Sequence, residues 1–394
     1  MKPLQQRLTS YTAPDDFRKA GIYPYFRTVT TPQLPQVLID GKPTLMLGSN
    51  SYLGLTDHPK VQQAAIDAIK RYGSGCAGSP FLNGTLDLHH QLEKAIAEFL
   101  HKDDAMLFSA GFQANAGTIP ALLSRNDHLI IDERDHASIM ETRRQTIANV
   151  HKYRHSDFSQ LRRILDTIPR DAVKLLATDA VFSMEGDLVP LPELVEICKE
   201  YQVTLMLDEA HSLGVFGNQG RGLADHFGVI DDVDILMGTF SKSLASVGGY
   251  IASDARTIDF LRHNVRPYIF TASIPPAATA SALAALQVMQ EEPWRQENLW
   301  KVTNYALKRF REEGFEVGPT ETPIIPLYVR DNEKTFQVTR LLHNMGIFVN
   351  PVVAPAVPSG DTLIRLSWMA THTIEHVDYA VDNINAAFRK LNLK

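Results

Sequence analysis

The feature that most constrains the fold is a series of short apolar runs that alternate with helical patterns over residues 59–252. Each run is continuously apolar, which is typical of strands that are buried on both faces. Such strands, separated by helices, indicate an α/β architecture with a mostly parallel sheet flanked by helices. The expected strands are Ala105–Phe108, His128–Ile131, Lys174–Ala177, Thr204–Leu207 and Ile235–Met237.

Helical patterns fill the stretches between these runs. Pro59 is well placed to begin a helix and Gly73 to end it, because proline suits the first helical turn and glycine the position after the last. Apolar residues at helical spacing indicate further helices along the chain. These are His89–Leu100, Ser159–Ile168, Leu194–Tyr201 and the alanine-rich Ala277–Gln290.

The chain has 394 residues, which suits a large domain accompanied by a smaller one. After the alanine-rich helix, the sequence Glu-Glu-Pro at 291–293 indicates a domain boundary. The remainder mixes helical patterns with two strands, Ile324–Val329 and Leu363–Ser367. We therefore expect an N-terminal arm with edge strands in 1–50, a large α/β domain in 51–290 and a small C-terminal α+β domain in 291–394.

Composition and charge exclude several classes of protein. Lys and Arg number 39 against 45 for Asp and Glu, and a net charge of −6 gives no electrostatic reason to expect nucleic acid. Two cysteines cannot make a disulfide framework, so a reducing cytoplasm is expected. Residues 1–12 lack the apolar core of a signal peptide. The uncharged stretch 267–290 is rich in Ala, Ser and Thr and contains a Pro-Pro pair, so no integral membrane segment is expected.

Two kinds of motif match the residue pattern of a known binding site but lack the neighbouring residues or secondary structure that the site requires. Residues 73–78 read G-x-G-x-x-G, but a dinucleotide site needs that sequence between a strand and a helix, and here it follows a helix. The pairs His151/His155 and His372/His376 have i, i+4 spacing without an H-E-x-x-H frame. Surface or core histidines are the better interpretation, and no metal is expected.

Asp208 and Lys242 carry the chemistry that the sequence favours. Asp208 follows one expected strand, with His211 three residues later, and Lys242 follows another strand within G-T-F-S-K-S. Ligands of parallel sheets bind outside the carboxyl ends of strands. A lysine amine can form a Schiff base with an aldehyde, and a carboxylate can keep a pyridine nitrogen protonated. The set therefore predicts a site for pyridoxal 5'-phosphate.

Two further stretches fit that cofactor. The loop Ser109–Phe112 lies between a strand and a helical pattern, where backbone amides can cradle a phosphate, helped by Thr239 and Ser241. His136 follows the strand that ends at Ile131, and an imidazole there can lie flat on a pyridine ring.

With these residues in place, the chain resembles the α-oxoamine synthases, a branch of the fold-type-I transferases that use pyridoxal phosphate, and in particular the bacterial members that act on L-serine and palmitoyl-CoA. These enzymes condense an amino acid with an acyl thioester, release CO2 and yield an aminoketone. The resemblance covers most of the chain. It rests on G-S-N-S-Y-L-G-L from Gly48, F-L-N-G-T from Phe81, D-E-R-D-H-A-S-I from Asp132, S-M-E-G-D from Ser183, A-H-S-L-G-V from Ala210, G-T-F-S-K-S from Gly238, and N-P-V-V with P-A-V-P between Asn350 and Pro358.

The resemblance implies catalytic roles for four residues. Lys242 would bind the cofactor covalently, and Asp208 would pair with its ring nitrogen. His136 would stack on the ring and help to orient the substrate carboxylate. His211, with Ser183, would bond the cofactor's phenolic oxygen.

The resemblance also implies how the substrate and the phosphate are held. Arg365 would clamp the amino-acid carboxylate, a task that suits its planar fork of donors, and Asn50 would help there. The family's sites lie at a homodimer interface. The phosphate would be held by Gly111, Phe112, Thr239 and Ser241, together with Thr271 and Ser273 of the partner subunit.

The implied reaction joins L-serine and palmitoyl-CoA into 3-ketodihydrosphingosine, CoA and CO2, the first step of sphingolipid synthesis. A related enzyme that uses glycine, alanine or another acyl thioester stays open, similar to 8-amino-7-oxononanoate synthase or 2-amino-3-ketobutyrate CoA ligase. The residues also leave open an aminotransferase and a non-catalytic scaffold subunit. Pro80 stands where the family usually has an arginine, and if that arginine contacts the acyl carrier's phosphates, an acyl-carrier-protein donor becomes plausible. A long-chain acyl substrate would permit transient contact with the inner membrane surface.

Overall fold

A seven-stranded sheet forms the centre of the larger lobe in the computed structural model, which describes residues 1–358 and 360–394. The strands lie in the order β3–β9–β8–β7–β6–β4–β5, and all of them run parallel except β9. The predicted mostly parallel sheet is therefore confirmed. Its strands are β3 (Asp104–Phe108), β4 (His128–Asp132), β5 (Asn149–Tyr153), β6 (Lys174–Asp179), β7 (Thr204–Asp208), β8 (Ile235–Thr239) and β9 (Gly249–Ser253).

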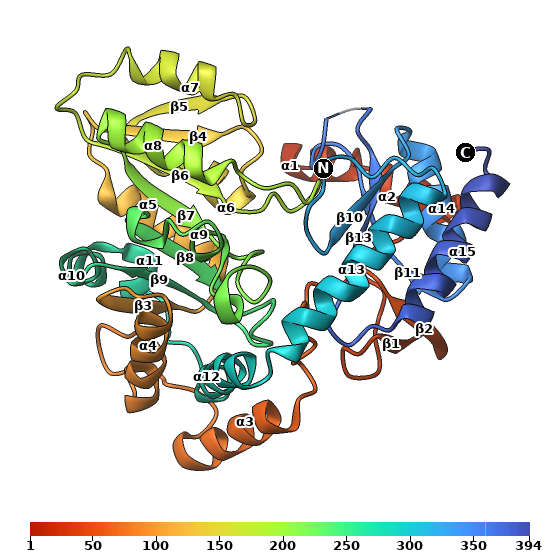
Figure 1. The fold of residues 1–394 in the computed structure, drawn as a ribbon, viewed down its shortest axis with the longest axis horizontal. Coiled ribbons are helices and arrows are strands. Elements are labelled where there is room, and N and C mark those ends of the chain that lie inside the picture. Colours follow the sequence, from red (N-terminus) through yellow and green to blue (C-terminus); the bar gives the residue numbers. More distant parts are fainter. Residues whose placement is uncertain (359) are drawn as a thin grey trace.

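Helices cover both faces of this sheet, which explains why its strands are continuously apolar (Figure 1). Within β3, Ala105 and Leu107 belong to one hydrophobic cluster, whereas Met106 and Phe108 belong to another. Because successive side chains of a strand point to opposite faces, each cluster lies on one side of the sheet. The helices of this lobe are α3 (Pro59–Tyr72), α4 (Asp87–Phe99), α5 (Gly111–Leu122), α6 (Ala137–Met140), α7 (Phe158–Leu165), α8 (Leu191–Tyr201), α9 (Leu223–His226), α10 (Ala255–Asn264), α11 (Arg266–Ile269) and α12 (Pro276–Glu291).

The smaller lobe combines the C-terminal part of the chain with strands from the N-terminal part (Figure 1). Strand β2 (Lys42–Met46) pairs antiparallel with β1 (Gln36–Ile39) and parallel with β11 (Ile347–Phe348). The edge strands expected within residues 1–50 thus join the C-terminal lobe. Its other elements are α1 (Pro3–Thr9), α2 (Ala13–Lys19), α13 (Trp294–Glu312), β10 (Ile324–Tyr328), α14 (Asn332–Asn344), β12 (Asn350–Val352), β13 (Leu363–Ser367) and α15 (Ile374–Lys390).

The helix ends follow the expected local signals. Pro59 occupies the first turn of α3, and Gly73 follows its last residue with φ of 81°, a conformation that glycine adopts without steric cost. The uncharged stretch 267–290 forms most of α11, a loop and most of α12, and the predicted alanine-rich helix Ala277–Gln290 lies within α12. Across residues 1–358 and 360–394, no helix has both the length and the apolar composition that crossing a membrane requires.

Candidate active site

The carboxyl ends of the parallel strands open into a cavity of about 280 Å³. Lys242, Asp208, His136 and His211 all line it, so the four residues with predicted catalytic roles lie together. The sheet brings them together because Asp208 ends β7 and Lys242 follows the neighbouring strand β8. This is the edge of the sheet where ligands of parallel α/β proteins bind.

Hydrogen bonds hold the Asp208 carboxylate in place from two sides. Its Oδ1 accepts the Ala210 N–H at 2.9 Å, and its Oδ2 accepts from Asn115 Nδ2 at 2.6 Å. Asn115 is fully buried in α5 and also donates to Ser138 Oγ at 2.9 Å. The sequence reasoning missed Asn115, although a lone amide in the mostly apolar stretch 114–119 of a helix is a usable signal, because a buried amide needs partners.

Lys242 lies in surroundings that favour an uncharged amine. Desolvation lowers the pKa of Lys242 to about 8, against the opposing attraction of Asp208 and Asp179. At neutral pH its amine is therefore free for nucleophilic attack in a larger fraction of molecules than an ordinary lysine amine.

The N-terminus of α5 forms a phosphate-sized cradle in the same cavity. Ala110, the residue before the helix, provides no side-chain cap, so the first backbone amides are available to an anion. A Cβ atom at Gly111 would lie 2.8 Å from Thr239 Oγ1, so only glycine allows this close approach. Thr239 and Ser241 share a hydroxyl contact of 2.9 Å, and both line the cavity with Gly111 and Phe112. The donor set fits a phosphate group.

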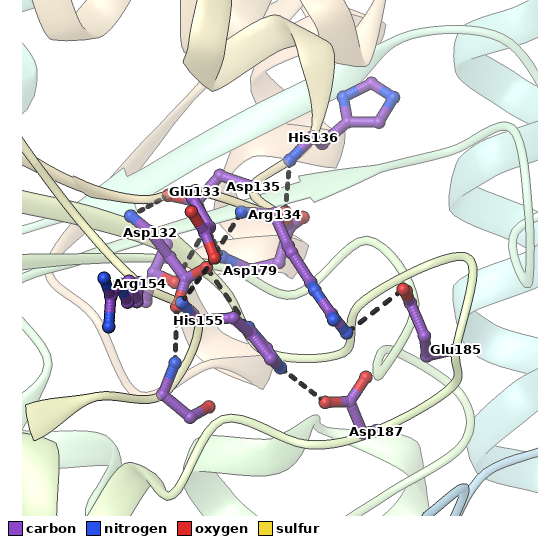
Figure 2. A network of polar contacts seen from close by, with 12 residues as sticks. Asp132, Glu133, Arg134, Asp135, His136, Arg154, His155, Asp179, Glu185 and Asp187 are labelled. Carbon is purple, nitrogen blue, oxygen red and sulfur yellow. Dashed lines mark hydrogen bonds and ion pairs between the residues drawn. The ribbon is translucent and has the colours of Figure 1, made fainter. Parts of the chain in front are cut away.

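His136 is fixed through its backbone, and its ring points away from the polar network (Figure 2). The residue lines the cavity. The His136 N–H donates to Asp179 Oδ2 at 2.5 Å, and its Nδ1 contacts Ser138 Oγ at 2.7 Å. Desolvation lowers the pKa of His136, so the ring tends to be neutral. Asp179, which ends β6 beside Asp208, was missed because the expected strand stopped at Ala177.

Burial raises the pKa of Asp179 well above its usual value, and the nearby Asp208 carboxylate adds to that effect. The amide donors around Asp208 suit a carboxylate that faces the cavity.

A second cavity of about 680 Å³ adjoins the first and shares Lys242, His136 and His211 with it. Asn50, Ser183 and Arg365 line this cavity, so the predicted substrate-binding residues meet there. The remaining walls come from Pro24–Phe26, Met184 and residues 348–356, which are mostly apolar.

Arg365 is a buried cation at the junction of the two lobes. Its Nε donates to the Ser183 carbonyl at 2.5 Å, Nη1 donates to Ser367 Oγ at 2.8 Å, and Nη2 donates to Asn50 Oδ1 at 3.1 Å. All three acceptors are neutral, so this buried charge is still suited to an anionic partner. An amino-acid carboxylate in the adjoining cavity has the required chemistry.

His211 is held by Tyr52, a residue that the sequence reasoning did not single out. The Tyr52 hydroxyl contacts His211 Nδ1 at 2.7 Å, and both side chains are buried. Desolvation lowers the pKa of His211 well below its usual value, with Lys242 and Arg365 acting in the same direction. The ring is therefore neutral.

Thr271 and Ser273 do not line the Lys242 cavity of their own chain. They line a separate cavity of about 310 Å³, together with Pro80. Thr271 Oγ1 accepts from Gln113 Nε2 at 2.8 Å, whereas the buried Ser273 Oγ has no hydrogen-bond partner within the described part of the chain. Their assignment to a partner subunit's phosphate site stays a prediction.

The histidine pairs of the sequence have structural partners. His151 contacts His128 at 2.9 Å, whereas His155 lies between Asp132 and Asp187 (Figure 2). The rings of His372 and His376 are 5.7 Å apart, edge to face. In residues 1–358 and 360–394, no cluster of three or more histidine, cysteine or carboxylate side chains is arranged to hold a metal ion.

The chain is similar to known proteins over nearly its whole length. The family model for aminotransferase class I and II matches residues 42–384. A serine palmitoyltransferase from Bacteroides ovatus is 56% identical over 390 residues, covering 99% of both chains. An 8-amino-7-oxononanoate synthase from Symbiobacterium thermophilum is 40% identical over 375 residues, covering 95% of both. A solved serine palmitoyltransferase with a pyridoxal phosphate internal aldimine superposes with a TM-score of 0.97 at 32% identity, covering 100% of both chains.

Proposed function

Because the chain belongs to the aminotransferase class I and II family, and within it to the α-oxoamine synthases, we propose that it condenses L-serine with palmitoyl-CoA into 3-ketodihydrosphingosine, CoA and CO2. The observation that carries the choice of substrates is the 56% identity to a serine palmitoyltransferase over 99% of both chains. The 8-amino-7-oxononanoate synthase from Symbiobacterium thermophilum is 40% identical, which makes that activity the less favoured alternative.

The cofactor is pyridoxal phosphate, and the lining of the smaller cavity fits it. When bound, this group supplies an aldehyde for an amine and a protonated ring that accepts the electrons of a carbanion. Lys242 would hold its aldehyde carbon, Asp208 its ring nitrogen and His211, with Ser183, its phenolic oxygen. The backbone amides of Gly111 and Phe112 and the hydroxyls of Thr239 and Ser241 would hold its phosphate, and His136 would cover one face of its ring.

The chain's own groups then divide the work on the amino acid. Arg365 and Asn50 bind the serine carboxylate, because the guanidinium is a buried fork of donors whose present acceptors are neutral. Once serine is bound and the Lys242 amine is free, the Lys242 Nζ removes the α-proton of serine. The lowered pKa of Lys242, about 8, supports this role. The Asp208 carboxylate, held by donors from Ala210 and Asn115, is placed to pair with a protonated ring nitrogen.

The larger cavity suits the apolar end of an acyl donor. Tyr25, Phe26, Val352, Val353 and Pro355 contribute apolar walls next to the groups that hold the amino acid. An acyl chain entering there would meet the substrate carbon from the side of the smaller lobe. The thioester carbonyl of the acyl donor would then lie next to the α-carbon of the amino acid. The apolar walls would exclude water from this contact.

Product analysis tests this function directly. The purified enzyme, loaded with pyridoxal phosphate, is incubated with palmitoyl-CoA and, separately, L-serine, glycine, L-alanine or L-threonine, and products are identified by mass spectrometry. We expect the serine condensation product in excess over the other three. A larger product yield with glycine or alanine would assign a related synthase, and amino transfer to a keto acid would assign an aminotransferase. The Lys242→Ala variant serves as the control.

The acyl carrier is tested by comparing palmitoyl-CoA with a palmitoyl acyl-carrier protein. Pro80 lines the 310 Å³ cavity with Arg262, a cation that pairs with Asp104 and Glu93, near the position where the family usually has an arginine. We expect the CoA donor to be preferred. We also expect Pro80→Arg to lower the KM for palmitoyl-CoA, because it adds a cation that can reach phosphate groups.

The active unit that we propose is a homodimer with shared sites. Ser273 carries a buried hydroxyl without a hydrogen-bond partner among the described residues, and Phe270, Phe81 and Leu82 near it are exposed apolar side chains. Both features suit a covered interface. Sedimentation should give a dimer. Mixing the inactive Lys242→Ala variant with a Thr271→Ala/Ser273→Ala variant should restore activity, because one of the two sites in the mixed dimer is then intact.

A further inference from the structure

His155 bridges two segments that lie on opposite sides of the polar network in Figure 2. Its Nδ1 lies 3.1 Å from Asp132 Oδ1, and its Nε2 lies 2.7 Å from Asp187 Oδ2. A carboxylate can only accept hydrogen bonds, so both ring nitrogens donate and the ring is a cation. Its side chain is 14% exposed, and its ring packs edge-on against Phe182 at 4.4 Å.

One side of this bridge is rigid. Asp132, the last residue of β4, also accepts the Arg134 N–H at 2.9 Å and the Ser156 N–H at 3.0 Å. The Asp132 N–H in turn donates to Asp135 at 2.7 Å, and Asp135 accepts the Thr178 hydroxyl at 2.8 Å. The end of β4 is thus fastened to β6, the strand that carries Asp179 and, through it, the His136 backbone.

The other side of the bridge is the loop of residues 183–187, hereafter the 183–187 loop. Two ion pairs connect it to the β4 end, Arg134 with Glu185 at 3.1 Å and His155 with Asp187. Its own backbone contributes a turn, in which Gly186 N–H donates to the Phe182 carbonyl at 2.9 Å. Backbone contacts hold the other side of the loop, because the Asp187 carbonyl accepts the Phe182 N–H at 3.0 Å and the Gly186 carbonyl accepts from Thr320 Oγ1 at 3.1 Å. The two ion pairs are its side-chain contacts to the β4 end.

The 183–187 loop contacts Arg365 through one backbone atom. The Ser183 carbonyl accepts from Arg365 Nε at 2.5 Å, and Ser183 lines the larger cavity with Arg365 and Lys242. A shift of this carbonyl would turn the guanidinium fork, since Nε and the two Nη atoms lie in one rigid plane. Fork geometry decides how well a carboxylate is bound.

We propose that His155 is a positioning residue for the amino-acid substrate: it ties the 183–187 loop to the end of β4 and thereby holds the Ser183 carbonyl where it aims Arg365. The side chain does not line either cavity, so it acts through Asp187 and the loop. The proposal rests on the proposed function only for the identity of the amino acid.

Two variants and one matched control test the proposal in the full-length enzyme. His155→Ala removes both contacts, and Asp187→Asn removes one charge while it keeps the size of the side chain, which makes it the test if the first variant fails to fold. The control is His151→Ala, since His151 precedes His155 by four residues and contacts a histidine instead of carboxylates.

The first readout is the dissociation constant of L-serine for the holoenzyme, measured by spectroscopic titration. We expect both variants to raise it by about tenfold or more, because a misdirected positioning group costs substrate binding at a distance. The KM for palmitoyl-CoA should change much less than the serine affinity, since Met184 is the only residue of the loop besides Ser183 that lines the larger cavity. A serine affinity unchanged in both folded variants overturns the proposal.

The second readout needs neither cofactor nor substrate. Hydrogen exchange of the apoenzyme should accelerate at the amides of the 183–187 loop in both variants and stay unchanged in His151→Ala. This result tests whether His155 holds the 183–187 loop against the end of β4, even if another amino acid proves to be the substrate. Unchanged loop exchange in the variants overturns the proposal independently of the proposed function.

The third readout separates positioning from general stability. In an Arg365→Lys background, His155→Ala should change the serine affinity much less than in the wild type. The guanidinium whose orientation His155 is proposed to fix is already absent there. If the two changes are additive in free energy, His155 does not act through Arg365 and the proposal fails.

Discussion

The Tyr52 hydroxyl and His211 Nδ1 lie 2.7 Å apart although 159 positions separate the two residues in the sequence. Burial raises the pKa of Tyr52, and the positive charge of Arg365 opposes that shift. Because the phenol and the ring are both uncharged, we expect the Tyr52 hydroxyl to donate its proton to His211 Nδ1. His211 is then left with its proton on Nε2, where it can donate to an anionic oxygen.

Tyr52→Phe should therefore affect catalysis more than folding. Loss of the hydroxyl frees the His211 tautomer and leaves Nδ1 buried without a donor, at a cost to stability of about 1–3 kcal/mol. We expect kcat to fall by roughly tenfold, since the hydrogen bond from His211 Nε2 would no longer be fixed. Steady-state kinetics and thermal unfolding check this together. A variant with normal kcat would show that the tautomer of His211 does not matter.

Lys242 should be the lysine that carries the cofactor. After the holoenzyme is treated with borohydride, peptide mapping by mass spectrometry should find the pyridoxyl mass on Lys242, and Lys242→Ala should lose both label and turnover. Lys102 is the internal control, because burial also lowers its pKa while its Nζ donates to the carbonyls of Ile230 and Val233. Label on Lys102 instead would contradict the site.

The uptake of pyridoxal phosphate by the apoenzyme should depend on pH in a defined direction. Only the neutral amine attacks an aldehyde, and the pKa of Lys242 is lowered to about 8, so the uptake rate should rise as the pH increases through 8. Because Asp208 opposes this lowering, Asp208→Asn should move the profile to lower pH. Borohydride trapping at a series of pH values measures both curves. A profile centred above pH 10 would mean that Lys242 is not desolvated.

Strand ends show why part of this site is invisible in the sequence. Apolar runs predicted β6 and β7 correctly, but the expected strands stopped at Ala177 and Leu207, whereas the structure continues them to Asp179 and Asp208. Hydrophobicity marks the buried middle of a strand and loses the polar residue at its end, where ligands bind. Asp208 was found because His211 and the lysine motif drew attention to it, and Asp179 had no such neighbour.

The sequence predicted only those strands of the sheet that form a continuous apolar run. Strand β5 has the sequence Asn-Val-His-Lys-Tyr and is largely exposed, because it lies at the edge of the sheet. An edge strand needs no continuous apolar run, so the criterion that found the central strands could not find it. The Tyr52–His211 contact and the Arg365–Asn50 hydrogen bond join segments far apart in the chain, which no local pattern encodes.

Arg365 should act on the amino acid and hardly on the acyl donor. Arg365→Ala should weaken L-serine binding by roughly 2–5 kcal/mol, the range for removing one partner of a buried charged pair. Arg365→Lys keeps the charge but loses the fork, so an intermediate loss is expected. Arg295→Lys is the control, since Arg295 is also buried but pairs with Glu292 away from both cavities. Serine titrations that leave Arg365→Ala unaffected would remove this residue from the site.

The ion pairs of His155 should make the stability of the protein depend on pH above neutrality. Hydrogen bonds to Asp132 and Asp187 outweigh the desolvation of the ring and raise the pKa of His155 to about 9, above its usual value of 6.5. A group with a raised pKa in the folded state stabilises that state fully below pH 6.5 and loses this contribution as the pH rises through 9. Asp187→Asn should accordingly lower the Tm at pH 6, and the difference from the wild type should shrink toward pH 10. Thermal unfolding across that range checks the trend, with His151→Ala as the comparison. A Tm difference that is constant from pH 6 to pH 10 would mean that the His155 ring carries no charge between the two carboxylates.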